Sequence, residues 1–364
     1  MRMLRVKYNK LFVTDNTKIA CIHRQIGRVI MELKGKKVMV VGTGISGIGA
    51  IDLLNKAGAD CIIYDANEKL TEEAVAKKLN GNKAQIIIGE LADDITEKVE
   101  LLVISPGVPV DSPLVKKFEE AGVPVWGEIE LAYNYDKGRI IAITGTNGKT
   151  TTTALVGQIV KAYNEQTYVV GNIGNSYTGE VLKTSENSYT VAEISSFQLE
   201  TVHRFHPVVS AILNITPDHL NRHHTMECYA HTKERIAENQ TKDDVCVLNM
   251  EDEELYRFGS ECKASVVWFS SKRKPDKGAY LDGDDIRYTD GTQDKLMLNI
   301  HDMNLLGTHN YENVCAAIAM TKAVGIPDDI IIEQVKCFKA VEHRRVYGIT
   351  MTLRELILKH LLRL

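Results

Sequence analysis

Short stretches rich in Val, Ile and Leu alternate with longer amphipathic stretches through most of this chain. The apolar stretches predict buried strands at 38–41, 61–64, 101–104, 139–144, 189–193, 209–215, 245–248 and 265–269. Helices are predicted between them, at 48–57, 152–162, 229–239 and 310–324. Apolar strands that alternate with helices are typical of a parallel sheet with helices on both faces. Asp-Gly pairs at 282–283 and 290–291 predict antiparallel hairpins in 278–298.

The pattern predicts an α/β protein of two domains. We expect a Rossmann-like domain over 31–125 and a central P-loop ATPase-like α/β domain over 126–342. Each has its own apolar strands and could form its own core. Residues 1–30 show no sustained periodicity and are expected to be a non-native extension, with Met31 as the true start.

The most informative motif is the turn Gly145-Thr146-Asn147-Gly148-Lys149-Thr150-Thr151. It lies between the strand predicted at 139–144 and the helix predicted at 152–162. A glycine-rich turn in that context directs backbone N–H groups and the positive end of a helix at phosphate. Lys149 can then reach the outer phosphates of ATP, and the Thr150 hydroxyl can bind Mg²⁺. The alternative is an ordinary glycine turn followed by a chance Lys-Thr pair.

A second glycine motif, Gly-x-Gly-x-x-Gly at 42–47, follows the first predicted strand. Asp65 lies eighteen residues beyond Gly47, at the end of the second predicted strand. This spacing matches a dinucleotide fingerprint and, taken alone, favours an NAD-dependent oxidoreductase. The same geometry holds any pyrophosphate, including that of a UDP-sugar, and a separate ATP loop downstream favours the UDP ligand. A purely structural turn is the third interpretation.

Two polar residues stand where predicted strands end, which is where such sheets bind ligands. Glu193 ends the strand at 189–193, and His219 follows the strand at 209–215. Glu193 and Thr150 offer the oxygen ligands that Mg²⁺ prefers. His219 is either a further ligand or a capped core histidine. Zinc at His219, His223 and His224 is an alternative, although their spacing matches no common zinc pattern.

Composition narrows the class of protein. The chain has 364 residues, 44% hydrophobic and 25% charged, which is ordinary for a soluble globular protein. Its net charge of −4 does not suggest a nucleic-acid surface, and no apolar stretch approaches the length of a membrane span. The seven cysteines are scattered without a Cys-x-x-Cys pair, which fits a reducing cytoplasm. We expect a cytoplasmic monomer that binds neither nucleic acid nor membrane.

The motifs together resemble those of the Mur ligase family. They occur in the family's order over about 31–344: the turn at 42–47, Ser105-Pro106-Gly107, the segment 127–130, the phosphate loop at 145–150, 171–174, 193–200, 213–219, 233–236, His309-Asn310 with Asn313, and 342–344. The segments at 171–174 and 193–200 point to the branch that adds D-glutamate. The resemblance implies an ATP-dependent ligase of peptidoglycan precursor synthesis that joins D-glutamate to UDP-N-acetylmuramoyl-L-alanine through an acyl phosphate.

The resemblance also implies residue roles. The UDP part would be held by Gly44, Ser46, Gly47 and Asp65, with Ser105, Pro106 and Gly107. The muramoyl-alanine part would be lined by Asn172, Ser196 and Gln198. The nucleotide would contact the loop from Gly145 to Thr151, Asn310, Asn313 and Arg344. Mg²⁺ would be bound by Thr150, Glu193, His219 and a carbamylated Lys233. Lys149, Lys233 and His219 would be the catalytic residues. Without the resemblance, Lys233 looks like a solvated helix lysine.

The last residues depart from the family's pattern, because a third domain that binds the amino acid would begin there. We interpret 343–364 as a hinge and a frameshifted tail. A two-base shift from the Ile349 codon permits a peptide like the Asn-Asp-Ser-Lys-x-Thr-Asn motif expected at that point. The alternatives are a leucine-rich terminal helix and, for the function, an inactive fragment that binds UDP-sugar and ATP. Resequencing the DNA across codons 340–364 tests this hypothesis.

Overall fold

The computed structural model describes residues 30–172, 174–339, 344–346 and 349–351, with no side-chain description for Asp93 or for the last two ranges. Residues 1–29 of the proposed extension, the tail after Met351 and Glu342-His343 therefore lie outside the described residues. In the part described, no helix is both long and apolar enough to cross a bilayer.

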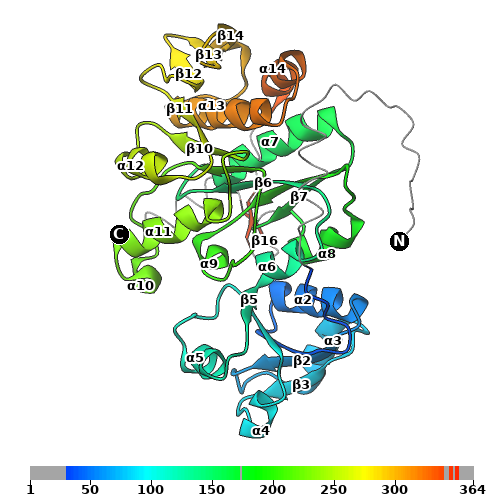
Figure 1. The fold of residues 1–364 in the computed structure, drawn as a ribbon. Coiled ribbons are helices and arrows are strands. Elements are labelled where there is room, and N and C mark those ends of the chain that lie inside the picture. Colours follow the sequence, from blue (N-terminus) through cyan, green and yellow to red (C-terminus); the bar gives the residue numbers. More distant parts are fainter. Residues whose placement is uncertain (1–29, 173, 340–343, 347–348, 352–364) are drawn as a thin grey trace, which may run out of the picture. The chain divides into compact units, whose positions relative to one another are not determined.

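The first sheet has five parallel strands in the order β3-β2-β1-β4-β5 (Figure 1). Their bounds are β1 (Lys37–Val41), β2 (Asp60–Asp65), β3 (Gln85–Ile88), β4 (Leu101–Ile104) and β5 (Val125–Gly127). The helices between them are α2 (Ile45–Lys56), α3 (Glu72–Leu79), α4 (Asp93–Thr96) and α5 (Pro113–Glu120). All four residues of β4 are buried, as expected for a parallel strand covered on both faces.

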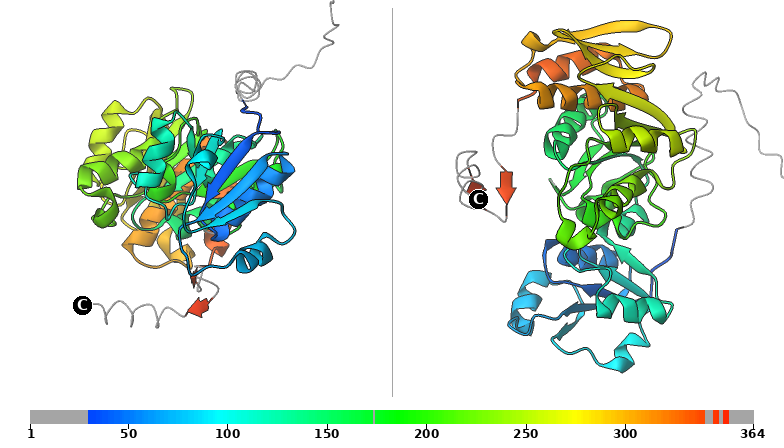
Figure 2. Two further views of the ribbon diagram at one scale, coloured as in Figure 1. Left: turned by 90° about the horizontal axis from the view of Figure 1, so that it is seen from below. Right: turned by 90° about the vertical axis from the view of Figure 1, so that its left-hand side faces the viewer.

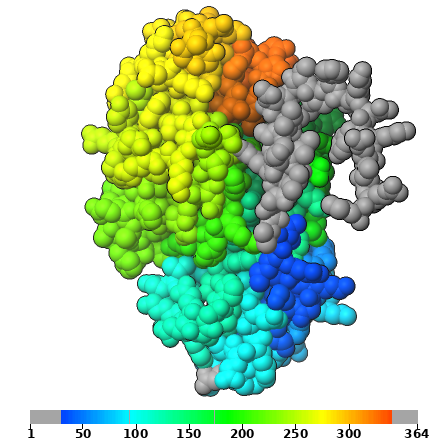
Figure 3. Space-filling view, viewed as in Figure 1, coloured from blue at the N-terminus to red at the C-terminus, as the bar shows by residue number. Residues whose placement is uncertain are grey.

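The second sheet has nine strands in the order β14-β13-β12-β11-β10-β9-β6-β8-β7. Its bounds are β6 (Arg139–Thr144), β7 (Thr167–Gly171), β8 (Tyr189–Glu193), β9 (Val209–Ile212), β10 (Val245–Asn249), β11 (Ser265–Ser270), β12 (Gly278–Asp282), β13 (Asp285–Thr289) and β14 (Asp294–Asn299). The strands from β7 to β12 are parallel, and β12–β14 are antiparallel, which confirms the predicted hairpins. Figure 3 shows the hairpin region and α14 on one face.

The helices of this second unit are α6 (Glu128–Tyr133), α7 (Lys149–Tyr163), α8 (Tyr177–Glu180), α9 (Ser196–Leu199), α10 (Leu220–His223), α11 (Met226–Glu234), α12 (Glu253–Glu261), α13 (Thr308–Ala323) and α14 (Asp328–Cys337). Three short 3₁₀ helices join them, η1 (Val181–Lys183), η2 (Arg235–Ala237) and η3 (Ile300–Asp302), and β15 (Arg344–Val346) pairs with β16 (Ile349–Met351). Helix α13 packs against α7 and the strands β9–β12 (Figures 1 and 2). Its residues 313–321 are all buried, and 314–320 join one hydrophobic core with α7 and the sheet.

The prediction of two α/β units with parallel sheets is confirmed, but several bounds were wrong. Helix α7 begins at Lys149 rather than at 152, because Gly148 adopts φ 82° and turns the chain directly into the helix. Helix α11 ends at Glu234, and η2 follows where a longer helix was expected. The domain boundary after residue 125 remains a proposal.

Candidate active site

The phosphate loop connects β6 to α7 and depends on two glycines with positive φ. Gly145 has φ 150° and Gly148 has φ 82°. A Cβ atom on Gly148 would lie 2.3 Å from Oδ1 of Asn313. Only glycine combines that backbone conformation with that close approach. The N-terminus of α7 thus faces the loop with its first N–H groups, an arrangement that favours anions.

Two lysines converge on this loop. Lys149 Nζ donates to the carbonyl oxygens of Gly145, over 2.7 Å, and Thr146, over 2.9 Å. Lys233 Nζ, from α11, donates to the same Gly145 oxygen over 2.9 Å and lies 4.6 Å from the centre of the Tyr229 ring. Lys149 and Lys233, the two lysines expected to be catalytic, are therefore neighbours of the loop at 145–151, which is expected to bind the nucleotide.

The interpretation of Lys233 as a solvated lysine was wrong, since its residue is only 1% exposed. Burial, helped by the charge of Lys149, lowers the pKa of Lys233 to about 7, against a weaker opposing effect of Asp218. A buried ammonium with one carbonyl acceptor is poorly compensated. Burial thus favours the neutral amine form of Lys233 near neutral pH more than in an exposed lysine.

Glu193 ends β8, next to β6, where it faces the same edge of the sheet. Its Oε1 accepts a hydrogen bond from Nδ2 of Asn172 over 2.8 Å. Its Oε2 is buried and has no hydrogen-bond partner among the described residues. A buried carboxylate oxygen without a partner is costly, and a hard cation is the ligand that best satisfies it.

His219 is not the capped core histidine that was one alternative. It has φ 53°, its side chain is 49% exposed, and its ring lies 4.8 Å from that of Phe197. The buried histidine is His223, whose Nε2 is 3.0 Å from Oγ of Ser196 and whose pKa burial lowers. Among residues with described side chains, no three His, Cys, Asp or Glu gather as a metal site.

Ser196 and Gln198 are placed by the short helix α9. The Ser195 hydroxyl accepts from the Gln198 N–H, and the Gln198 side chain accepts from the Ser195 N–H, which makes a capping box. Residues of α9 and of the segment predicted to bind the UDP-substrate line the same hollow. It is lined by Ile104, Ser105, Pro106, Val108, Gly127, Glu128, Phe197, Gln198 and Thr201.

The turn at 42–47 is held together by side chains that were expected to touch the UDP part. A Cβ atom on Gly42, which has φ 102°, would lie 2.7 Å from Oγ of Ser105. Asp65 Oδ2 accepts from the N–H of Thr43 over 3.1 Å and its hydroxyl over 2.8 Å. Burial alone would raise the pKa of Asp65, but hydrogen bonds from Thr43 and Asn67 outweigh it and lower that pKa.

Ser46 lies beside the buried carboxyl group of Glu128. Burial raises the pKa of Glu128, and the hydrogen bond from Ser46 partly offsets that rise. Asn310 and Asn313 lie in the first part of α13, and Asn313 approaches Gly148. The side chain of Arg344 lies outside the described part, although its backbone belongs to β15. Gly44, Gly47 and Gly107 lie in or beside the turns after β1 and β4.

Sequence reasoning missed two residues. The Tyr229 hydroxyl lies 3.1 Å from Oγ1 of Thr146, and its ring contacts the Lys233 ammonium. Arg235 donates to backbone carbonyls at the end of α9. The spacing of four between Tyr229 and Lys233, which places both on one helix face, could have indicated the first. No local signal could have indicated the contacts of Arg235, because its partners are 33–36 residues away.

Comparison with known proteins agrees with this geometry. Residues 36–127 match the model of the Mur ligase MurD-like N-terminal domain, and residues 143–321 match that of the Mur ligase middle domain. A UDP-N-acetylmuramoylalanine–D-glutamate ligase of Lachnospira eligens is 78% identical over 88% of this chain and 71% of that protein. The chain belongs to the Mur ligase family, in the branch of the D-glutamate ligases. The family prediction is confirmed.

Other relatives place the chain in the same family. Proteins of the same name from Lachnoclostridium phytofermentans and Clostridioides difficile are 50% and 44% identical; the matches cover 88% and 87% of this chain and 71% and 70% of those proteins. The solved UDP-N-acetylmuramate:L-alanyl-gamma-D-glutamyl-meso-diaminopimelate ligase from Neisseria meningitides shares the fold. Its TM-score is 0.57 at 18% identity, over 84% of this chain and 99% of that one. Family membership favours the UDP-sugar interpretation of the 42–47 turn over the nicotinamide one.

Proposed function

We propose that this chain catalyses the ATP-dependent joining of D-glutamate to UDP-N-acetylmuramoyl-L-alanine, in peptidoglycan precursor synthesis. The observation that carries the proposal is the meeting of Lys149, Lys233 and Glu193 around one phosphate loop, in a chain whose relatives bear that activity in their name. The relatives' reaction uses ATP, and the loop supplies the N–H groups and the ammonium that an ATP phosphate needs.

The reaction balances in two steps. The terminal carboxylate of the alanyl group attacks the γ-phosphorus of ATP, so that ADP leaves and an acyl phosphate forms. The amine of D-glutamate then attacks the acyl carbon, phosphate leaves, the amine loses a proton and an amide forms. Lys149 would leave the Gly145 carbonyl for the phosphates and stabilise their charge.

The residues fit a bound Mg²⁺ ion. Glu193 offers a buried oxygen that has no hydrogen-bond partner among the described residues, and the Thr150 hydroxyl lies in the first turn of α7. His219 and Lys233 are the other expected ligands. Protein ligands alone do not complete the set, which suits an ion that keeps waters and phosphate oxygens. When bound, Mg²⁺ neutralises phosphate charge.

Lys233 fits the carbamate that the family resemblance implies. With a pKa of about 7, much of the Lys233 amine is neutral at neutral pH. Its nitrogen can add to the carbon of CO₂ and lose a proton, which forms an N–C bond and replaces a cation by an anion. The carbamate would attract Lys149 and Mg²⁺, whereas the ammonium repels Lys149.

On the substrate side, we assign Asn172, Ser196 and Gln198 to the muramoyl-alanine part. We assign binding of the UDP part to the 42–47 turn, Asp65 and the 105–107 segment. We assign Asn310, Asn313 and Arg344 to the nucleotide. Ser105 and Gln198 line one hollow, which supports assigning both to the UDP-substrate. We further propose that the chain acts as a cytoplasmic monomer, which light scattering on the purified protein tests.

Phosphate release tests the function. Release from ATP that requires both UDP-N-acetylmuramoyl-L-alanine and D-glutamate supports it. Lys149→Met should abolish release, and Lys161→Met, an exposed position on the same helix, should leave it unchanged. Binding of both ATP and the UDP-substrate without D-glutamate-dependent release would instead assign a binding role. Failure to bind the UDP-substrate overturns both.

A further inference from the structure

We propose that Arg235 is a positioning residue for the UDP-substrate side of the site and acts through α9. Helix α9 carries Ser196 and Gln198, which the proposed function assigns to the muramoyl-alanine part, and the inference rests on that assignment. Arg235 belongs to η2, directly after the helix that carries Lys233. One residue thereby connects the segment expected to bind the substrate with the segment that reaches the phosphate loop.

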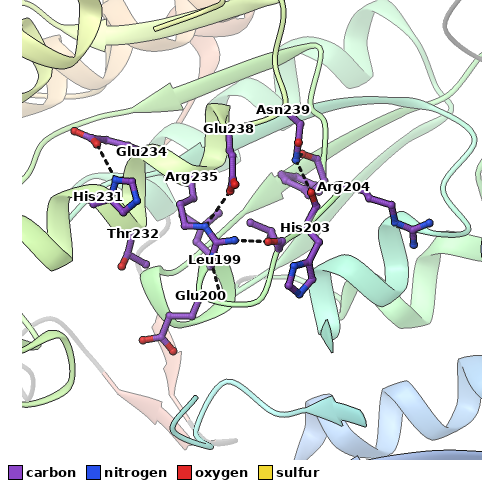
Figure 4. Close-up of polar contacts among 12 residues, drawn as sticks. Leu199, Glu200, His203, Arg204, His231, Thr232, Glu234, Arg235, Glu238 and Asn239 are labelled. Atoms are coloured by element: carbon purple, nitrogen blue, oxygen red, sulfur yellow. Dashed lines mark hydrogen bonds and ion pairs between the residues drawn. The ribbon is translucent and has the colours of Figure 1, made fainter. Parts of the chain in front are cut away.

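The contacts of Arg235 are with backbone carbonyls at the end of α9 (Figure 4). Its Nη1 donates to the oxygens of Leu199, over 3.0 Å, and Glu200, over 2.6 Å, and its Nη2 donates to that of Val202, over 2.5 Å. Its Nε donates to Oε2 of Glu238 over 2.9 Å. Glu238 thus holds the guanidinium through a nitrogen that the carbonyls do not use.

Arg235 adds donors to these carbonyls, of which that of Leu199 also accepts the Val202 N–H over 3.4 Å. The last carbonyls of any helix lack an intrahelical partner, and α9 has only four residues. A helix of that length does not hold its own direction. The planar guanidinium of Arg235 can serve several acceptors at once, which a lysine ammonium does less well. Arg235 therefore helps to fix the exit of α9, together with Arg222, whose guanidinium binds the Glu200 carboxylate, and through it the direction of Ser196 and Gln198.

The next part of the same loop is held by other residues. Glu130 accepts hydrogen bonds from the N–H groups of His203, Arg204 and Phe205. Asn239 Nδ2 donates to the carbonyl oxygens of His203, over 3.0 Å, and Phe205, over 3.1 Å (Figure 4). Asn239 therefore donates to the backbone carbonyls of the distal loop as Arg235 donates to those of α9, and it lies only four residues further along the chain. It is the matched control.

Binding measurements on the full chain separate the two residues. Titration calorimetry with UDP-N-acetylmuramoyl-L-alanine should show affinity about tenfold weaker in Arg235→Ala and about threefold weaker in Arg235→Lys. Affinity for ATP should change less than about twofold, because the nucleotide contacts lie outside α9. Asn239→Ala should leave both affinities unchanged. Equal losses for both ligands, or equal effects of Arg235→Ala and Asn239→Ala, would overturn the proposal.

Hydrogen exchange of backbone amides gives a second readout that needs no ligand. Arg235→Ala should speed exchange in 196–202 and spare 203–206, and Asn239→Ala should do the reverse. If the wild type binds no UDP-substrate, the proposed function fails. The structural half of the inference is then still decided by exchange. If α9 loosens without any loss of substrate affinity, or does not loosen at all, the positioning role is wrong.

Discussion

Lys149 and Lys233 donate to one acceptor, the carbonyl oxygen of Gly145, over 2.7 and 2.9 Å. Two ammonium groups on one oxygen repel each other, and Lys233 is the buried member of the pair. The lowered pKa of Lys233 follows from its burial first and from this repulsion second. Lys149 and Lys233 thus place positive charge at the loop, which favours the binding of a polyphosphate.

The Lys233 pKa makes stability depend on pH. The native pKa of about 7 lies below the ordinary 10.5, so between these values the unfolded chain binds more protons than the folded one. The free energy of unfolding should therefore rise from pH 7 toward pH 10 by an amount that Lys233→Met removes. Urea denaturation of both proteins at pH 7 and pH 9.5, in CO₂-free buffer, measures the difference. If the free energy of unfolding changed with pH equally in the wild type and in Lys233→Met, a buried, unmodified Lys233 amine would be contradicted.

Gly148→Ala should damage both folding and nucleotide binding. The substitution meets positive φ and an Asn313 oxygen 2.3 Å from the new Cβ. We expect a loss of about 2–4 kcal/mol in unfolding free energy and ATP affinity at least about tenfold weaker. Gly122→Ala is the control, because Gly122 has φ 74° but nothing within 4 Å of its Cβ. It should cost about 1 kcal/mol and leave ATP binding intact. Equal costs at the two positions would show that the Asn313 contact is unimportant.

Glu193→Gln should separate metal binding from folding. Glutamine keeps the shape and can still accept the Asn172 hydrogen bond at 2.8 Å, but it removes the charge of the unpartnered oxygen. Mg²⁺-dependent ATP affinity should fall about tenfold, while the unfolding temperature without metal should not fall. Calorimetric ATP titrations with and without Mg²⁺ measure the first effect. An unchanged Mg²⁺ dependence would remove Glu193 from the proposed ligand set.

The local features of the site were predictable from sequence. Glycines at 145 and 148 between an apolar strand and a helix allow the positive φ values of a phosphate loop, and Glu193 ends a strand in an α/β pattern. The strands themselves follow from runs of buried β-branched residues, as in β6 and β8. The start of α7 was predicted three residues late, since Thr150 and Thr151 carry no helix signal of their own.

The tertiary structure alone decided the environments of Lys233, His219 and Arg235. Lys233 reaches a carbonyl 88 residues away, and Arg235 reaches carbonyls 33–36 residues away. These contacts exist because β9 pairs with β6 and β6 with β8, which brings the ends of three distant segments to one edge of the sheet. Backbone conformation is set mainly by neighbours in the chain, so it can be predicted from local sequence. Burial, charge state and hydrogen-bond partners are set by neighbours in space, and for these residues the sequence by itself determined only the side chain that would be there.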